Sequence, residues 1–233
     1  MKNVCVIVQA RLDSSRIEQK MIKPFGNSTL LDIILEKLKK STIISDNDVY
    51  ISLYEEELKS IARKYNFNIF NRSKESASVE NNMMCMFEWW EKLPYTHYVL
   101  VSACNPFLTI ETIEDFYKIF QTTKNKGMFA VVKRKNYFWN DSKEMITYWG
   151  ETQTNFNTKF VEDTYEAAHC LYAGNLNDIG KGIYMGNFSK KEVELYIIKN
   201  EFETLDIDYP WQFQLYDAYI CKNNNYKIEK KMY

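Results

Sequence analysis

The chain has 233 residues, of which 45% are hydrophobic and 26% charged, and its thirty Lys and Arg residues nearly balance thirty-one Asp and Glu residues. This balance excludes a basic protein built to bind nucleic acid or an anionic membrane surface, and no stretch is long and apolar enough to span a bilayer. Five widely spaced cysteines fit no zinc pattern and predict free thiols in the cytoplasm, with no secretory signal expected. The length suits one α/β domain covering residues 1–233.

The opening segment combines an apolar run with a cationic loop. Residues 4–8 are rich in β-branched side chains and predict a buried strand. The polar loop that follows carries Arg11, Ser14, Ser15, Arg16 and Lys20. Open α/β sheets bind ligands at the carboxyl ends of their strands, so this loop is predicted to hold a polyphosphate. Because it has no glycine before Gly26, it is not a P-loop, and side chains must supply most phosphate contacts.

Strand and helix patterns then alternate along the chain. The predicted strands are residues 48–53, 68–70, 98–102, 128–133 and 196–198. The predicted helices are residues 28–38, 55–65, 79–92, 110–124 and 210–221. The first helix begins at Ser28 or Thr29, either of which is a good N-cap residue. This alternation predicts a doubly wound, mostly parallel, Rossmann-like sheet with right-handed crossovers.

The rhythm changes between residues 134 and 175, which are rich in Asn, Tyr, Thr and Trp and show no long helical period. We expect loops and short antiparallel strands here, near residues 144–148 and 168–173, forming an excursion from the sheet. The whole chain has 17 Tyr, 14 Phe and 5 Trp. Surplus aromatic residues are typical of subunit interfaces and of sugar pockets. The segment is therefore a candidate arm for a homodimer.

Residues 8–20, which read Val-Gln-Ala-Arg-Leu-Asp-Ser-Ser-Arg-Ile-Glu-Gln-Lys, resemble the opening signature of the sugar cytidylyltransferases. Residues 102–108, 165–173 and 206–213 agree with that family in order and spacing. The similarity covers most of the chain and extends to the spore-coat polysaccharide type and to the synthetases of CMP-Kdo and CMP-sialic acids. The resemblance implies a nucleotidyltransferase fold. It also implies an enzyme that transfers CMP from CTP to a sialic-type acidic sugar, with release of pyrophosphate, for surface glycan biosynthesis.

The sequence departs from the family pattern in three places. Asp13 stands where the loop usually has Gly, and residues 17–19 replace Leu-Pro-Gly. Cys104 stands where the Kdo-type and spore-coat-type members have an Asp that helps to hold metal. Sialic-type members also lack that Asp, so this departure favours the sialic-type branch.

The resemblance implies a nucleotide site made by Ala10, Arg11, Ser14, Ser15, Arg16, Lys20, Arg72, Ser102 and Asn105. A triphosphate carries close to four negative charges, which the loop cations and one Mg²⁺ would offset. Arg11 and Lys20 are expected to be catalytic through this neutralisation, together with Asp208. Arg72 is expected to meet the cytosine base, with a surface pair to Glu75 as the alternative.

Asp206 and Asp208 are the expected ligands of Mg²⁺ or Mn²⁺. In an extended segment, two residues that are two positions apart share one face, about 7 Å apart. Mg²⁺ prefers a few carboxylates completed by substrate phosphates and waters. The alternative is a loop acid followed by an N-cap for the helix that begins at Pro210.

The acceptor is expected to contact Tyr165, Glu166, His169, Tyr172 and Lys181. His169 is either a general base or a packed, hydrogen-bonded side chain, and the segment around Lys181 is either a loop over an anionic acceptor or a turn. Three other functions stay open: a cytidylyltransferase that makes a CDP product from a sugar or polyol phosphate, a glycosyltransferase that uses residues 206–208 as an Asp-x-Asp motif, and a non-catalytic relative.

Overall fold

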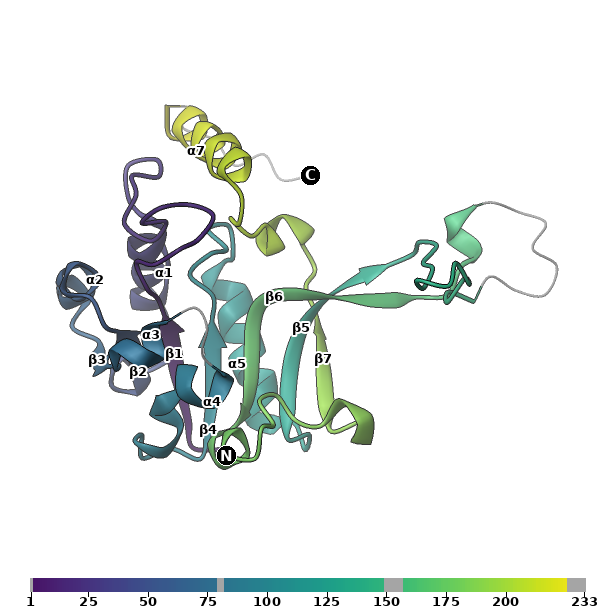
Figure 1. Ribbon diagram of the computed structural model, residues 1–233, viewed down its shortest axis with the longest axis horizontal. Helices are drawn as coiled ribbons and strands as arrows, with labels where there is room; N and C mark the ends of the chain where they lie inside the picture. The colour runs from purple at the N-terminus through teal and green to yellow at the C-terminus, as the bar shows by residue number, and fades with distance from the viewer. Residues whose placement is uncertain (1, 79–81, 149–156, 226–233) are drawn as a thin grey trace.

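The computed structural model describes residues 2–78, 82–148 and 157–225. Its centre is a seven-stranded sheet with the order β3-β2-β1-β4-β6-β5-β7 (Figure 1). The strands are β1 (Val4–Gln9), β2 (Val49–Leu53), β3 (Asn68–Asn71), β4 (His97–Val101), β5 (Gly127–Arg134), β6 (Thr164–Asn175) and β7 (Val193–Ile197). The α-helices are α1 (Leu30–Lys39), α2 (Glu56–Ala62), α3 (Lys74–Ala77), α4 (Met83–Met86), α5 (Ile110–Thr122), α6 (Leu176–Ile179) and α7 (Pro210–Asn225). The 3-10 helices are Asp46–Asp48, Arg63–Tyr65, Glu88–Glu91, Thr158–Phe160, Phe188–Lys190 and Glu201–Thr204.

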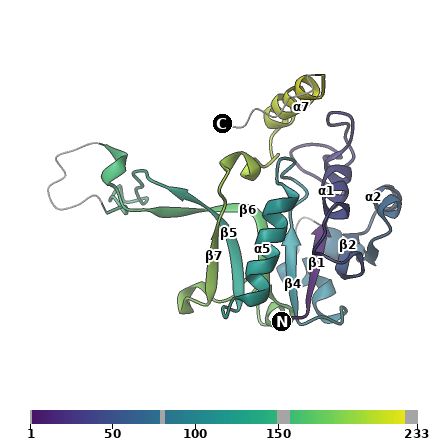
Figure 2. The ribbon, with the colours of Figure 1, turned by 180° about the vertical axis from the view of Figure 1, so that it is seen from behind.

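The predicted doubly wound, mostly parallel sheet is confirmed. Strand β1 pairs in parallel with β2 and β4, so Val6 lies between Val49 and Val99 in register. Helices α1, α2 and α5 cover one face, and α4 and α6 cover the other, as the views from front and back show (Figures 1 and 2). Burial on both faces explains why β1 and β4 read as continuous apolar runs.

The sequence prediction for residues 168–173 was wrong in one respect. They belong to β6, a single twelve-residue strand inserted between β4 and β5 and antiparallel to both. This segment is thus part of the central sheet and not of an excursion. A strand added antiparallel can lie beside its neighbours without a crossover helix, and the alternation of helix and strand in the sequence does not show it.

The helix expected over residues 79–92 is also different, and its first residues, 79–81, lie outside the described ones. Helix α4 ends at Met86, and a 3-10 turn follows, because Phe87 leaves helical geometry with φ −102° and ψ 35°. This turn buries Trp89 completely against Tyr98, with ring centroids 5.1 Å apart. The indole N–H donates to Gln9 Oε1 at 2.9 Å, so tertiary packing overrides the helical pattern here.

Strands β5 and β6 continue beyond the body of the protein as a long two-stranded arm, drawn at the right of Figure 1. The arm carries four exposed apolar side chains, Trp139, Ile146, Tyr148 and Phe160, each at least 55% exposed. Part of the loop that joins the two strands, residues 149–156, lies outside the described residues. Among the helices described, none has the length and apolar character that crossing a membrane requires.

Candidate active site

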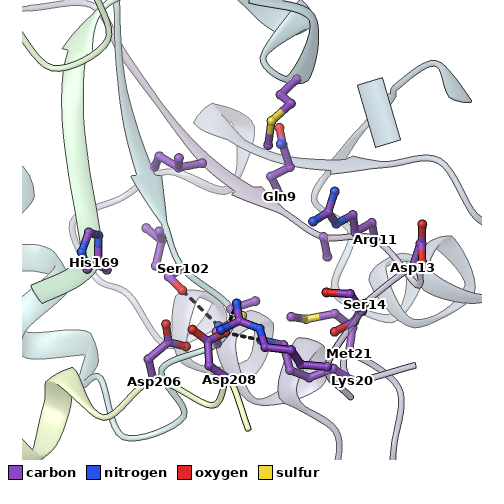
Figure 3. Close-up of a pocket in the computed structure, with 18 of the residues that line it drawn as sticks. Gln9, Arg11, Asp13, Ser14, Lys20, Met21, Ser102, His169, Asp206 and Asp208 are labelled. Carbon is purple, nitrogen blue, oxygen red and sulfur yellow. Dashed lines mark hydrogen bonds and ion pairs between the residues drawn. The ribbon is translucent and has the colours of Figure 1, made fainter. Parts of the chain in front are cut away.

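The cationic loop borders a pocket of about 550 Å³ at the carboxyl ends of β1 and β4 (Figure 3). Predicted site residues that line it are Ala10, Arg11, Ser14, Ser15, Arg16, Lys20, Arg72, Ser102, His169, Tyr172, Asp206 and Asp208. These residues come from five separate parts of the chain. The topology collects them because β1 and β4 are parallel neighbours, and β6 runs past the same edge.

The loop after β1 is fixed at two points. The backbone N–H of Leu12 donates to Glu55 Oε1 at 3.0 Å, which ties the start of the loop to the N-cap of α2. Further along, Ile17 is buried and Gln19 adopts a left-handed conformation with φ 51°. The left-handed residue turns the chain so that Lys20 points inward and is only 7% exposed. The loop that carries the cations is therefore held by a hydrogen bond and by burial, without a glycine cradle.

Lys20 joins the loop to the C-terminal acidic segment. Its ammonium group donates to the carbonyl of Ile207 at 2.5 Å and lies 3.4 Å from Asp208 Oδ1. The same carboxylate oxygen lies 3.1 Å from Arg16, whose guanidinium group also packs over the ring of Tyr209. Asp208 thus neutralises two of the cations that a triphosphate would meet.

Asp206 has a different environment from Asp208. Its Oδ1 atom is buried without a hydrogen-bond partner. Burial, together with the nearby charge of Asp208, raises the pKa of the Asp206 carboxyl above its ordinary value. A carboxylate oxygen that is desolvated and unpaired fits a ligand for a hard cation such as Mg²⁺. Among residues 2–78, 82–148 and 157–225, no group of three His, Cys, Asp or Glu side chains converges on a metal position, so phosphate oxygens would have to complete the coordination.

Arg72 is a buried guanidinium at the rim of β3. It is 4% exposed, and its Nε donates to Ser76 Oγ at 3.0 Å while a terminal nitrogen donates to the Ser76 carbonyl. A further terminal nitrogen lies 3.5 Å from the carbonyl of Ala10. Burial and the nearby charge of Arg11 lower the Arg72 pKa to about 10. The structure therefore places Arg72 in the pocket and not on the surface.

A β-bulge directs His169 into the pocket. The pairing of β5 with β6 shifts register between Phe129 and Val131, and His169 takes the left-handed conformation with φ 52°. Such a conformation is uncommon for residues other than glycine. Bulges often occur next to active sites, where they change the direction of a side chain. His169 Nδ1 lies 3.2 Å from the hydroxyl of Tyr172, and Figure 3 shows the ring on the same side of the pocket as Asp206. His169 is therefore not a packed core histidine.

The loop after β4 contributes through its first residues. Ser102 lines the pocket, and its hydroxyl accepts a hydrogen bond from the backbone N–H of Cys104 at 3.1 Å. Cys104 also lines the pocket, and burial raises the pKa of its thiol. Asn105 is almost fully buried outside the lining, where its amide donates to the Thr204 carbonyl at 3.2 Å. Asn105 thus anchors the segment before Asp206.

Three residues expected to contact the acceptor lie elsewhere. Tyr165 and Glu166 are exposed on the part of β6 that leads into the arm, and Glu166 pairs with Arg134 at 2.6 Å. Lys181 follows α6 and pairs with Asp178 at 2.9 Å. Helix α6 begins beside Thr96, which precedes β4, so Lys181 lies at the edge of the sheet opposite the pocket. These positions separate the three residues from His169 and Tyr172.

Several residues that border the pocket were not among the predicted site residues. Gln9, Met86 and Leu100 line it, and Glu55 anchors its loop. Gln9 belongs to the opening motif of residues 8–20, and this was the available signal, since a polar residue at the end of the first strand faces the carboxyl edge. Glu55 was hidden because its role depends on a contact with residue 12, across 43 positions.

A cationic loop, a buried guanidinium and paired carboxylates thus meet at the carboxyl edge of a doubly wound sheet, which is where such sheets bind nucleotides. A family model described as "Cytidylyltransferase" matches residues 5–185 of the chain. The protein belongs to this cytidylyltransferase family and is an enzyme that transfers cytidylyl groups. Family membership favours nucleotidyl transfer over glycosyl transfer as the reaction of this enzyme.

The chain is similar to the uncharacterized protein MJ1063 of Methanocaldococcus jannaschii, with 25% identity over 97% of this chain and 96% of that protein. It is also 31% identical to the spore coat polysaccharide biosynthesis protein SpsF of Bacillus subtilis, over 32% of this chain and 34% of SpsF. Among solved structures, CMP:2-keto-3-deoxy-manno-octonic acid synthetase complexed with CTP has a similar fold, with a TM-score of 0.66, 9% identity and coverage of 95% and 99% of the two chains.

Proposed function

We propose that this protein transfers CMP from CTP to an acidic sugar of the nonulosonic, sialic type and releases pyrophosphate, in the biosynthesis of a surface glycan. The observation that carries the proposal is the meeting of Lys20, Asp206 and Arg72 in one pocket. Nothing in their sequence separation requires this, and in the proposed complex each of the three would contact a different part of the nucleotide. The similarity to SpsF supports the polysaccharide context.

The chemistry follows from the charges of the pocket. An acceptor hydroxyl attacks the α-phosphorus, and the bond from that phosphorus to the β-phosphate oxygen breaks. Arg11, Arg16 and Lys20 neutralise the oxygens of the triphosphate, and Ser14 and Ser15 can donate hydrogen bonds to them. Since Arg16 and Lys20 already contact Asp208, the phosphates compete with this carboxylate for both cations. Nucleotide binding is therefore expected to release Asp208.

Asp206, and Asp208 once released, would hold Mg²⁺ or Mn²⁺ together with the phosphates. The metal would add positive charge beside the α-phosphorus. The buried, unpaired Oδ1 atom of Asp206 supports this assignment. Cys104 gives no carboxylate on the facing loop, so the metal set on this chain consists of the C-terminal pair.

The base and the acceptor occupy the other sides of the pocket in this proposal. Arg72 lies under the carbonyl of Ala10, where a guanidinium can donate to the carbonyl of a pyrimidine. His169 and Tyr172 stand on the acceptor side, and Ser102 lines the same pocket. Among the described residues that line the pocket, His169 alone carries an imidazole, which can take the proton of the attacking hydroxyl.

We also propose that the enzyme is a cytoplasmic homodimer. Its cysteines at positions 5, 85, 104, 170 and 221 are free, which suits a reducing compartment. The arm extends away from the body and carries exposed aromatic and aliphatic side chains, which is typical of a surface that a second subunit covers (Figure 1).

A pyrophosphate-release panel tests the function. CTP, UTP, ATP and GTP are each combined with Mg²⁺ and with Kdo, sialic-type acids or sugar phosphates. We expect release from CTP with one class of acid and its loss in Asp206→Ala. Release with a sugar phosphate alone would replace the proposal with a CDP-forming reaction, and CTP binding without any release would favour a non-catalytic relative.

A further inference from the structure

A second cavity of about 320 Å³ adjoins the active-site pocket on the α4 face of the sheet. We call it the aromatic pocket. Its own walls are formed by Met83, Phe87, Tyr98, Phe129, Tyr184 and Met185. Phe87 and Phe129 are each only 6% exposed, and the Phe87 ring lies edge-on to Tyr184 with centroids 6.0 Å apart. None of these side chains carries a charge.

The aromatic pocket and the active-site pocket share Leu100, His169 and Tyr172. The Phe129 ring lies edge-on to Tyr172 with centroids 5.0 Å apart, directly behind the acceptor side of the active site. The two pockets are therefore contiguous, and a substituent on an acceptor bound beside His169 could extend into the aromatic pocket. An apolar pocket of about 320 Å³ beside a reaction site has room for part of a substrate.

Two glycines hold the outer wall of the aromatic pocket close to the sheet. A Cβ atom at Gly127 would lie 1.8 Å from the Met185 carbonyl oxygen, and one at Gly174 would lie 2.1 Å from the Tyr184 carbonyl oxygen. The hydroxyl of Tyr98 also donates to the Tyr184 carbonyl. Only a residue without a side chain allows this approach at either position. The wall is thus fixed by the backbone before any ligand arrives.

We propose that the acceptor carries an uncharged acyl or alkyl substituent of a few carbon atoms, and that this substituent occupies the aromatic pocket. The inference rests on the proposed function and specifies its acceptor class. A charged or strongly hydrated group would lose its water against these walls and find no partner. Each methylene buried there strengthens binding about three- to fourfold.

The test uses neuraminic acids whose amino group carries an acetyl, a propanoyl or a butanoyl chain, with CMP present so that no turnover occurs. Affinity is measured by the NMR signals of ¹³C-methyl methionine. We expect the dissociation constant to fall about three- to fourfold with each added methylene. The signals of Met83 and Met185 should shift, while that of Met84, which is 41% exposed on the same helix, should not.

Filling the pocket gives the matched comparison. Met83→Trp should remove the dependence on acyl length, Met185→Phe should weaken it, and Met84→Trp should preserve it, with CTP affinity unchanged in all three. Equal affinities across the acyl series, or no binding by any member, would overturn the inference. Affinity that rises with acyl length but without pyrophosphate release from CTP would support the pocket and refute the proposed reaction. Pyrophosphate release from CTP with an affinity that does not depend on acyl length would support the proposed reaction and refute the role of the aromatic pocket.

Discussion

Lys20 and Asp208 are separated by 188 positions in the chain and lie 3.4 Å apart in the structure. The pair closes one side of the active-site pocket, because Lys20 also donates to the Ile207 carbonyl. The cationic loop after β1 and the segment of residues 206–208 are therefore held together, and a change in either should alter nucleotide binding. This contact leads to the first of four predictions.

Lys20→Met should lower the rate of pyrophosphate release about 100- to 1,000-fold, which is typical for the loss of one charged group at a developing negative charge. The rate and the affinity for CTP are measured together by single-turnover kinetics and calorimetry. Lys39→Met is the control, since Lys39 pairs with Asp46 on the surface away from the pocket. A rate within threefold of the original would contradict the assignment of Lys20 to the phosphates.

The Asp206 carboxyl should titrate above its ordinary pKa of 3.8, because it is buried and lies near Asp208. The folded protein then binds this proton more tightly than the unfolded chain. The resulting stability is fully present below the unfolded pKa and is lost as pH rises through the folded pKa. If ionised Asp206 holds the metal, activity should fall as pH drops through the same raised value.

The test is a ¹³C carboxyl NMR titration without metal. Asp208→Asn removes the neighbouring charge and should move the Asp206 midpoint to lower pH, while Asp46→Asn, at the surface, should leave it in place. A midpoint that does not respond to Asp208→Asn would show that the two carboxylates are not coupled.

Glu55→Ala should weaken CTP binding about tenfold, although Glu55 is not among the residues that line the pocket. The change leaves the Leu12 N–H without its acceptor, and losing one such hydrogen bond to a charged group costs about 1.5–3 kcal/mol. The affinity for CTP and the melting temperature are measured side by side. Glu57→Ala, an exposed position on the same helix, is the control. An unchanged affinity for CTP would rule out a role for this contact in ordering the loop.

Ile146→Asp should convert the proposed dimer to monomers without lowering the melting temperature of the monomer. Ile146 is 64% exposed on the arm, so an aspartate there costs nothing until a second subunit buries it. Molar mass by light scattering reports the change. Ile43→Asp, 37% exposed on the body of the protein, is the matched control. A wild-type protein with the molar mass of a monomer at high concentration would contradict the proposed dimer.

Much of the fold could be predicted from local pattern. The continuous apolar runs at residues 4–8 and 98–101 indicate central strands, because such strands are covered on both faces of the sheet. The helix predicted over residues 110–124 is α5, which begins at the predicted residue and ends two residues earlier, at Thr122. Thr29 was one of two expected caps and does accept from Asp32. These features depend on contacts within one element or with its immediate layer.

The sequence by itself determined the first strand, the cationic loop after it and the acidic pair Asp206 and Asp208, because residue type and short spacing suffice to recognise them. Only the tertiary structure decided that Lys20 meets Asp208, that Glu55 holds the loop and that a bulge turns His169 inward. It also decided that Lys181 lies far from the pocket. These outcomes depend on strand order, register and backbone conformation, which bring together positions whose separation in the chain carries no periodic signal.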